Sequence, residues 1–436
     1  MIVDFTVTNF RSIQDEQIFS LYVETAGTHL PENVSYPAGD KIGVLKSAGI
    51  YGANASGKSN LLMAFRALQY IVVNSGDLKE GNAVAYEPYL LSESNQVAPT
   101  RFEIEFFVTP ENKHSKSLRY RYVVAFTAQK IVEESLFFYP TTQRAMIFNR
   151  TIDDTWETIR FGSLYKGGKK RLPFFENNSY LSKAGNSADA PQMIREVYNY
   201  LRSFIVYLGV NQIEETLGWF REIELTRKVI GLLRFVDTGI CGIRIEEKTN
   251  FDDIYIPDDI PSEIKKFILT QEKYKILFLH KTETGENQFL GEEKESDGTR
   301  KLFRLAPLLI RTLSEGKVLI MDELESSMHP FMAELIIKLF NDPRVNKNNA
   351  QLIFSTHNIN LMTPELLRRD QIWFTEKQQG ATKFYSLDDF DKKKVKPQSP
   401  FNQWYAEGRF GAIPTIDYQG IVELFNPPED EHAEKT

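Results

Sequence analysis

The chain has 436 residues, of which 42% are hydrophobic and 25% charged, and its formal net charge is −7. A chain of this size can bury a sizeable core, and the composition excludes a disordered or fibrous protein. The acidic balance argues against a surface that is a nucleic-acid platform throughout, although it allows a local basic groove.

Targeting segments and metal motifs are absent from the sequence pattern. No run of eighteen apolar residues occurs, and the start, MIVDFTVTNF, lacks the positive region of a signal peptide. We therefore expect a cytoplasmic protein with no membrane partner. Cys241 is the only cysteine and the six histidines show no HxxxH or HExxH spacing, so we expect neither an internal disulfide nor a structural zinc site.

The first 165 residues are predicted to form a strand-rich lobe. Apolar and polar positions alternate over the first dozen residues, and similar patterns return at 46–51, 101–108 and 118–126. Loops containing Asn, Gly and Pro separate these runs. We assign 1–165 to a first lobe.

A phosphate-binding loop lies inside this first lobe. The segment from Gly52 to Ser59 matches GxxxxGK[ST] and stands between an apolar strand and an amphipathic, helix-like run, the context that the motif requires. Backbone N–H groups of such a loop cradle the phosphates of ATP, Lys58 reaches the β- and γ-phosphates, and Ser59 ligates Mg²⁺. The expected nucleotide-binding residues here are Gly52, Asn54, Ala55, Ser56, Gly57, Lys58, Ser59 and Asn60.

Helical spacing dominates the middle of the chain. From about residue 189, apolar residues recur at intervals of three and four, first up to about 208 and then over 215–236. The pattern contains no sustained heptads with charged flanks, which excludes a long coiled-coil arm. We expect a helical insertion, or lateral domain, over 166–290.

Strands and helices alternate in the last part of the chain. A helix-like run at 299–313 precedes an apolar strand at 318–321, a helix at 330–340 and a second apolar strand at 351–355. This alternation is typical of a parallel α/β sheet, so we assign 291–425 to a second lobe and predict the α/β class overall. The acidic end, 426–436, is expected to be a flexible tail.

Two acids follow the apolar strand at 318–321. Asp322 would hold Mg²⁺, and Glu323 would act as the general base that orients the attacking water. His357 follows the next strand, where it could reach a γ-phosphate. Because 264 residues separate Lys58 from Asp322, a large insertion must divide the two halves of the site.

These motifs resemble ABC-type ATPases of the Rad50, RecF and OLD branch, and the resemblance covers nearly the whole chain. The segments ESDGTRKL, DELESSMHP, STHN, RRDQIWF and GRFGAIP are most similar to the bacterial AAA15 group. The resemblance implies an ATPase head in which Arg11 and Ser12 lie near the nucleotide. It also implies that Ser296 and Gly298 form a degenerate signature that serves the partner's nucleotide, with His357 as the switch histidine.

The same resemblance implies how the protein is assembled and used. Such heads sandwich ATP in a homodimer or a higher even-numbered oligomer, and AAA15 members are commonly ATPase subunits of anti-phage or abortive-infection systems. No TOPRIM-like arrangement follows His357, so any nuclease or toxin activity would come from a separate effector protein.

Two other functions stay open at this point. A RecF-like repair clamp would bind DNA, for which the basic clusters 169–171 and 392–394 are candidate phosphate contacts. A P-loop GTPase or small-molecule kinase is disfavoured, because the NKNN stretch at 346–349 lacks the Asp that reads guanine. Gln96 and Gln129 are the candidates for a glutamine loop, and the pattern does not choose between them.

Overall fold

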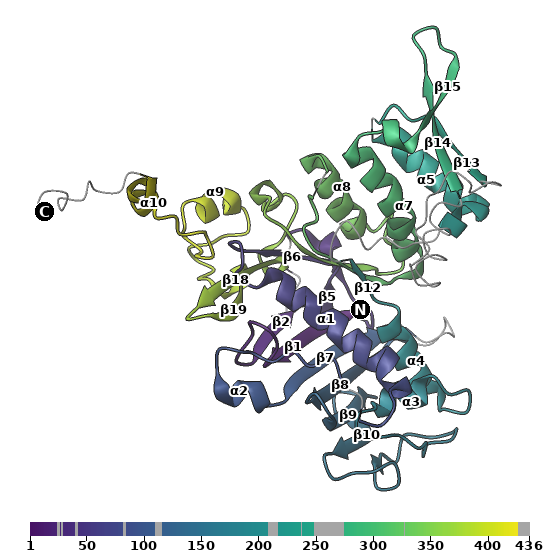
Figure 1. The fold of residues 1–436 in the computed structure, drawn as a ribbon, viewed down its shortest axis with the longest axis vertical. Coiled ribbons are helices and arrows are strands. Elements are labelled where there is room, and N and C mark those ends of the chain that lie inside the picture. Colours follow the sequence, from purple (N-terminus) through teal and green to yellow (C-terminus); the bar gives the residue numbers. More distant parts are fainter. Residues whose placement is uncertain are drawn as a thin grey trace, which may run out of the picture.

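The computed structural model describes residues 1–23, 27, 29–39, 42–81, 84–109, 116–207, 217–236, 238–247, 274–326 and 328–425. The tail predicted over 426–436 lies outside these residues. Two large sheets form the body of the molecule, with helices between and around them (Figure 1).

The first lobe contains a seven-stranded antiparallel sheet in the order β11-β10-β9-β8-β7-β1-β2. Apolar and polar residues alternate along its strands, as in β7, where alternate side chains from Thr100 to Phe106 are buried. The sequence patterns at 101–108 and 118–126 are therefore confirmed as strands, and the pattern over the first dozen residues forms a strand over 2–8. The bounds are β1 (Ile2–Thr8), β2 (Gln17–Ser20), β7 (Thr100–Val108), β8 (Leu118–Phe126), β9 (Ile131–Tyr139), β10 (Ala145–Thr151) and β11 (Arg160–Phe161). A short helix, α2 (Glu93–Val97), precedes β7.

A small three-stranded sheet lies beside this lobe in the order β3-β5-β4. Its strands are β3 (Tyr22–Val23), β4 (Val34–Ser35) and β5 (Gly43–Leu45), and the 3-10 helix η1 (Pro31–Asn33) leads into β4. The peptide after β5 continues directly into the central sheet.

The central sheet has six strands in the order β12-β16-β17-β6-β18-β19, all parallel except the edge strand β19. Its middle strands read as continuous apolar runs because both faces are covered. The bounds are β6 (Ser47–Tyr51), β12 (Ile205–Tyr207), β16 (Val318–Met321), β17 (Gln351–Ser355), β18 (Ile372–Gln378) and β19 (Ala381–Ser386). The α/β class predicted from the sequence is confirmed.

Helices cover the two faces of the central sheet. Helix α1 (Lys58–Asn74) lies between the central and antiparallel sheets, so Val318 and Ile320 share one core with the first lobe (Figure 1). Leu319 and Met321 point to the opposite face, into the core formed with α8 (Pro330–Asn341) and α7 (Asp297–Glu315). Because these four residues of β16 alternate between the two faces of the sheet, this one strand contributes side chains to both cores.

The block expected to be a helical insertion also contains strands. Helices α3 and α4 contact α1, and β12 joins the central sheet, whereas α5 packs on α7 beside a three-stranded sheet in the order β13-β14-β15. Hairpin sequences between 242 and 291 give a weaker periodic signal than the helices around them, so these strands escaped prediction. The bounds are α3 (Tyr180–Gly185), α4 (Gln192–Arg202), α5 (Ile223–Phe235), β13 (Gly242–Glu247), β14 (Tyr274–Lys281) and β15 (Asn287–Gly291).

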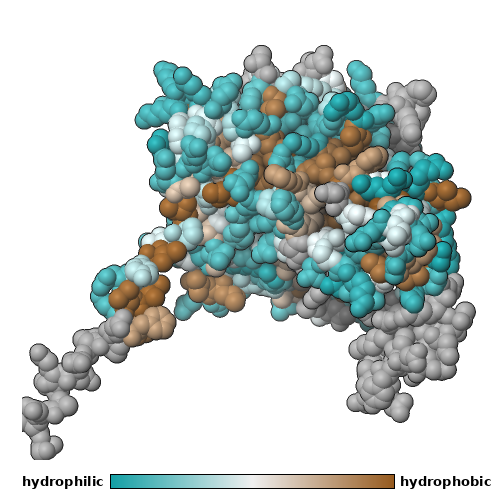
Figure 2. Space-filling view, turned by 90° about the horizontal axis from the view of Figure 1, so that it is seen from above, coloured by the Kyte–Doolittle hydropathy of each residue, from teal (hydrophilic) through white to brown (hydrophobic). Residues whose placement is uncertain are grey.

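The last two helices are α9 (Phe401–Ala406) and α10 (Tyr418–Phe425). Helix α10 stands away from the body, and its arm shows apolar side chains on the surface (Figures 1 and 2). Leu424 and Phe425 are 75% and 78% exposed. Among the described residues, no helix is both long enough and apolar enough to cross a membrane.

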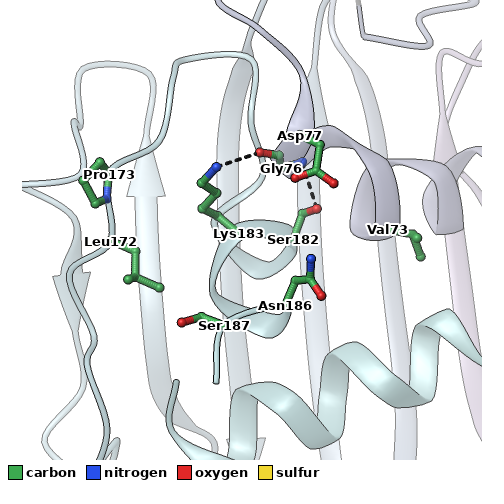
Figure 3. Close-up of a pocket in the computed structure, with 9 residues that line it drawn as sticks. All are labelled: Val73, Gly76, Asp77, Leu172, Pro173, Ser182, Lys183, Asn186 and Ser187. Carbon is green, nitrogen blue, oxygen red and sulfur yellow. Dashed lines mark hydrogen bonds between the residues drawn. The ribbon is translucent and has the colours of Figure 1, made fainter. Parts of the chain in front are cut away.

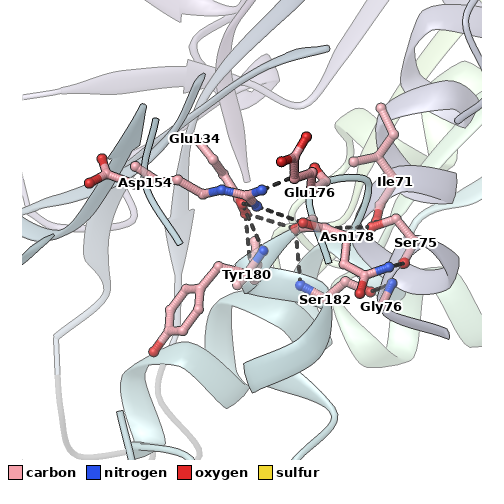
Figure 4. Close-up of polar contacts among 12 residues, drawn as sticks. Ile71, Ser75, Gly76, Glu134, Asp154, Glu176, Asn178, Tyr180 and Ser182 are labelled. Carbon is pink, nitrogen blue, oxygen red and sulfur yellow. Dashed lines mark hydrogen bonds and ion pairs between the residues drawn. The ribbon is translucent and has the colours of Figure 1, made fainter. Parts of the chain in front are cut away.

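A buried ion pair joins strands β9 and β10 of the antiparallel sheet and lies beside the start of α3 (Figure 4). The Glu134 carboxylate lies 3.6 Å from the Arg150 guanidinium, and both side chains are almost wholly buried. Glu134 also accepts hydrogen bonds from the backbone N–H groups of Tyr180 and Leu181, at 2.7 and 3.0 Å. Burial lowers the pKa of Arg150, and the Glu134 carboxylate opposes that shift. The charges of this pair are thus compensated by each other and by aligned polar groups, and for Arg150 also by the carboxylates of Glu176 and Asp154.

We predict that Glu134→Ala lowers the free energy of unfolding by about 3–5 kcal/mol, since a buried guanidinium then loses its counter-charge. Chemical denaturation measures this difference. Glu133→Ala, one residue away with a half-exposed side chain, should change the free energy of unfolding by less than about 1 kcal/mol. Equal effects of the two substitutions would contradict a special role for the buried pair.

Candidate functional site

The loop between β6 and α1 has the backbone of a phosphate cradle. Ala55 and Gly57 have φ angles of 60° and 113°, which turn the chain sharply before α1 begins at Lys58. The Lys58 ammonium donates hydrogen bonds to the carbonyl oxygens of Gly52 and Ala53, at 2.9 and 3.1 Å. The loop thus closes around the Lys58 side chain. The N-terminal end of α1 points into the hollow of the loop.

Three acidic residues act on the pKa of the Lys58 ammonium. Burial lowers the pKa of the Lys58 ammonium, while the carboxylates of Asp322, Glu323 and Glu325 act in the opposite direction. The structure therefore brings the two predicted halves of the site, 264 residues apart in sequence, within electrostatic reach of each other.

The hairpin of β18 and β19 supports the loop from the side. Ser56 and Thr375 share a hydroxyl hydrogen bond of 2.6 Å, and Thr382 donates to the Ser56 carbonyl oxygen at 2.8 Å. A methyl group added at Gly57 would overlap the side chain of Thr382. Sequence reasoning missed both threonines, because nothing in a threonine on a strand distinguishes a loop contact from ordinary packing.

The structure places Arg11, Ser12 and Asn60 next to the loop. A chain of hydrogen bonds runs from Asn60 Nδ2 to Ser12 Oγ at 2.6 Å and from Ser12 to Thr382 Oγ1 at 2.7 Å. Arg11 reaches Asn60 Oδ1 at 3.5 Å and pairs with Glu87 at 2.6 Å. The N-terminal strand and the distant hairpin therefore meet at the first turn of α1.

Asp322 and Glu323 lie at the carboxyl end of β16, two strands from β6. Ser355, at the end of the intervening β17, donates a hydrogen bond to Asp322 and accepts one from the Glu323 N–H at 2.9 Å. Glu323 has a φ of 48°, a conformation that a non-glycine residue adopts at a cost of about 1–3 kcal/mol. The Glu323 N–H and the Glu323 carbonyl oxygen, which accepts from the Ser326 N–H at 2.9 Å, both take part in hydrogen bonds that hold the backbone in this conformation.

A third acid holds the turn that carries His357. The Glu325 carboxylate accepts one hydrogen bond from the Thr356 hydroxyl and another from the His357 N–H, each at 2.6 Å. The resemblance implied only that the stretch from Glu325 to Pro330 is the loop that crosses the dimer interface, and it gave Glu325 no contact with the turn at His357. His357 is exposed and lies at the same sheet edge as Asp322.

Ser296 and Gly298 lie at the start of α7. Ser296 is the N-cap of this helix, since its hydroxyl accepts a hydrogen bond from the Thr299 N–H at 3.1 Å. Further along α7, the buried side chain of Lys301 donates to the carbonyl oxygen of Ser326, in the loop after the two acids. The helix that carries Ser296 is thereby tied to the Asp322 edge within the same chain.

The two glutamine candidates lie on loops or short helices. Gln96 belongs to α2 and donates to the Leu90 carbonyl oxygen at 2.9 Å, and Gln129 lies in the turn between β8 and β9. The Gln96 side chain contacts Leu90 and the Gln129 N–H donates to the Thr127 hydroxyl, so neither of these contacts includes a residue of the phosphate loop. The choice between the two remains as the sequence left it.

One family model matches most of the chain. It is described as "AAA domain, putative AbiEii toxin, Type IV TA system" and matches residues 47–363, from the first residue of β6 to beyond His357. No curated protein matches the chain.

Several solved structures are similar in fold. The SMC head domain from Thermotoga maritima is 13% identical, with a TM-score of 0.39, and the match covers 88% of this chain and 98% of that one. An SMC head bound to the C-terminal winged-helix domain of ScpA is 13% identical, with a TM-score of 0.41, covering 90% and 99%. An SMC head with an extended coiled coil from Pyrococcus furiosus is 12% identical, with a TM-score of 0.39, covering 90% and 97%.

We predict that Gly57→Ala abolishes nucleotide binding, because the new methyl group would collide with Thr382 and the residue would have to keep a positive φ. Isothermal titration with ATP measures the loss. Gly285→Ala is the matched control, since Gly285 also has a positive φ but has no atom within 4 Å of the added Cβ position. Unchanged ATP affinity in Gly57→Ala would show that the hairpin does not shape the loop.

Proposed function

This chain belongs to the AAA-domain family whose model matches residues 47–363, and we propose that it is an ABC-type ATPase that binds and hydrolyses ATP as a switch. The observation that carries this proposal is the common edge of the central sheet. The phosphate loop follows β6, Asp322 and Glu323 follow β16, and His357 follows β17, the strand between them. Parallel strands place such residues at the same edge, where nucleotides bind in α/β sheets.

The residues of this edge suit the chemistry of phosphoryl transfer. Lys58 would exchange its contacts with Gly52 and Ala53 for phosphate oxygens, with the loop N–H groups completing the cradle. Ser59, exposed in the first turn of α1, and Asp322, held by Ser355, would bind Mg²⁺, which when bound neutralises phosphate charge. Glu323 would orient water as the general base, and His357 would contact the γ-phosphate.

We further propose that the working form is a homodimer or a higher even-numbered oligomer. The phosphate loop and α1 would cover one side of a bound triphosphate. The exposed helix start at Ser296 and Gly298 would contact the other side of a triphosphate that a second copy binds. A two-fold axis provides this arrangement twice. Phe331, 72% exposed in the first turn of α8, supplies an apolar side chain near the same edge.

A role in anti-phage defence, with a separate effector, is the cellular function that we propose. The AbiEii description of the family supports a link to toxin systems. The exposed apolar side chains of α10 offer a surface for a protein partner. Nuclease activity is assigned to the effector and not to this chain, and the protein is proposed to act in the cytoplasm. A nuclease or toxin gene beside this one would support the proposal, and replication genes would favour repair.

The two basic clusters give little support to the alternative of a clamp that binds DNA. The Arg171 guanidinium donates to the Trp156 carbonyl oxygen at 3.3 Å and stands over the Phe161 ring. Lys170 stands over Tyr165, and Lys392 pairs with Asp388 at 3.1 Å. These cations already contribute to local packing, so they are weaker candidates for phosphate contacts than free cations would be.

We predict that Glu323→Gln reduces the rate of ATP hydrolysis by at least about 100-fold while ATP affinity is kept, because a general base acts in the chemical step. Steady-state turnover and isothermal titration separate the two effects. Glu334→Gln, at a partly exposed glutamate on α8, is the control and should leave turnover unchanged. Parental turnover in Glu323→Gln would assign the base to another residue.

The dimer proposal predicts complementation between two inactive variants. Lys58→Ala lacks the phosphate cradle and Ser296→Arg blocks the helix start, so each homodimer should be inactive. A heterodimer retains one composite site built from the intact Lys58 of one copy and the intact Ser296 of the other. Mixing the variants in equal amounts should restore part of the ATPase activity. No recovery, with heterodimers demonstrated by mass spectrometry, would make Ser296 an ordinary helix cap.

A further inference from the structure

Arg11 lies in a strained turn beside the first turn of α1. Its φ of 50° is a left-handed conformation that residues with a side chain rarely adopt, and Asn9 nearby has a φ of 53°. The Arg11 N–H donates a hydrogen bond to the carbonyl oxygen of Glu87 at 2.8 Å. Glu87 belongs to the segment that joins α1 to β7, so a residue distant in sequence holds this turn.

Glu87 holds the side chain of Arg11 as well as its backbone. The Glu87 carboxylate accepts a hydrogen bond from Arg11 Nε at 2.6 Å. The outer nitrogens of the guanidinium, Nη1 and Nη2, make only one hydrogen bond with a described residue, a long contact of 3.5 Å between Nη1 and Asn60 Oδ1. The guanidinium is therefore held at Nε, and most of the donors on its outer edge remain available to a ligand.

Hydrogen bonds around the phosphate loop show where this outer edge lies. Thr382 donates its hydroxyl proton to the Ser56 carbonyl oxygen at 2.8 Å, so Ser12 donates its own proton to Thr382 at 2.7 Å. The Ser12 oxygen therefore accepts from the Asn60 amide nitrogen at 2.6 Å, and Asn60 Oδ1 faces Arg11. Because Asn60 belongs to the first turn of α1, the outer edge of the guanidinium lies beside the helix end that receives phosphates.

Two tyrosines fix the backbone on either side of Glu87. The Tyr86 hydroxyl donates to the Ala98 carbonyl oxygen at 2.6 Å, and the N–H of the buried Tyr89 donates to Asn9 Oδ1 at 3.0 Å. The Glu87 side chain itself is half-exposed. An ion pair that solvent reaches contributes little to the stability of the fold, whereas a carboxylate on a fixed backbone is well suited to orient another side chain.

We propose that Glu87 is a positioning residue for nucleotide binding, an inference that rests on the proposed ATPase function. Its carboxylate holds Arg11 through Nε, and Nη1 and Nη2 then donate to a phosphate oxygen of ATP. The ion pair stays intact when the phosphate arrives, because the carboxylate and the phosphate use different N–H groups of the guanidinium. Ordering this long side chain before ATP binds lowers the entropy cost of the contact.

The cavity at the other end of α1 serves packing instead. It measures about 310 Å³ and is lined by Leu172, Ser182 and Lys183 among others (Figure 3). Ser182 Oγ accepts from the Gly76 N–H at 2.9 Å, and Lys183 donates to the Gly76 carbonyl oxygen at 3.0 Å. These two side chains hold the turn after α1 against α3, so we assign this cavity no ligand.

A double-mutant cycle, with ATP affinity measured by isothermal titration of the full chain, tests this role. Glu87→Gln removes the charge that orders the guanidinium and should weaken ATP binding roughly three- to tenfold. Arg11→Ala should weaken it at least as much. In the Arg11→Ala background, Glu87→Gln should change ATP affinity by less than about twofold, because Glu87 acts only through the arginine.

The matched control is Glu93→Gln, at an exposed glutamate of α2 in the same segment, which should bind ATP like the parent. Equal weakening by Glu87→Gln in both backgrounds would overturn the proposal, because Glu87 would then act on the segment and not on Arg11. Unchanged or tighter ATP binding by Glu87→Gln would overturn it too, tighter binding meaning that Glu87 competes with the phosphates for Arg11. A parent protein that binds no ATP would instead refute the proposed function, and this role with it.

Discussion

The position of β6 between β17 and β18 is the constraint on which the site depends. Strand β6 comes from the first eighth of the chain, but both its neighbours come from the last fifth. The phosphate loop begins where β6 ends, and the hairpin of β18 and β19 supplies the threonines that hold it. The loop therefore has its native shape only when the two ends of the chain have paired, so the chemistry of residues 52–59 belongs to the assembled sheet and not to the motif alone.

The acidic residues depend on the same sheet in a different way. Ser355 links Asp322 to the Glu323 backbone, and Glu325 links that loop to the turn at His357. Each link crosses from the end of β16 to the end of β17. Because interstrand distances in a sheet are fixed by backbone hydrogen bonds, the ends of β16 and β17 hold the loops that carry these side chains at a fixed separation. A positive φ at Glu323 is stable in this setting because hydrogen bonds on both sides determine the turn.

Sequence reasoning recovered the parts of this site that carry local patterns. The glycine-rich loop, the apolar strands and the acids after Val318–Met321 each occupy contiguous residues, and the family resemblance added Arg11 and Ser12, which do lie beside Asn60. Thr375, Thr382 and Lys301 could not be found in this way, because their role comes from contacts across 25 or more residues and their residue types are common on strands and helices. The strands β13–β15 were missed because short hairpins next to strong helical periodicity leave little signal.

The interleaving of the two chain ends also has a consequence during protein synthesis. A growing chain emerges N-terminus first, so β6 and α1 leave the ribosome long before β17, β18 and β19 exist. The antiparallel sheet uses only strands from residues 2 to 161, but β6 must wait, apolar and without strand neighbours, until β17 and β18 have emerged, at residues 355 and 378. A truncated translation product that ends before β17 would therefore carry the complete glycine-rich motif, would not bind nucleotide, and would expose a strand edge prone to aggregation.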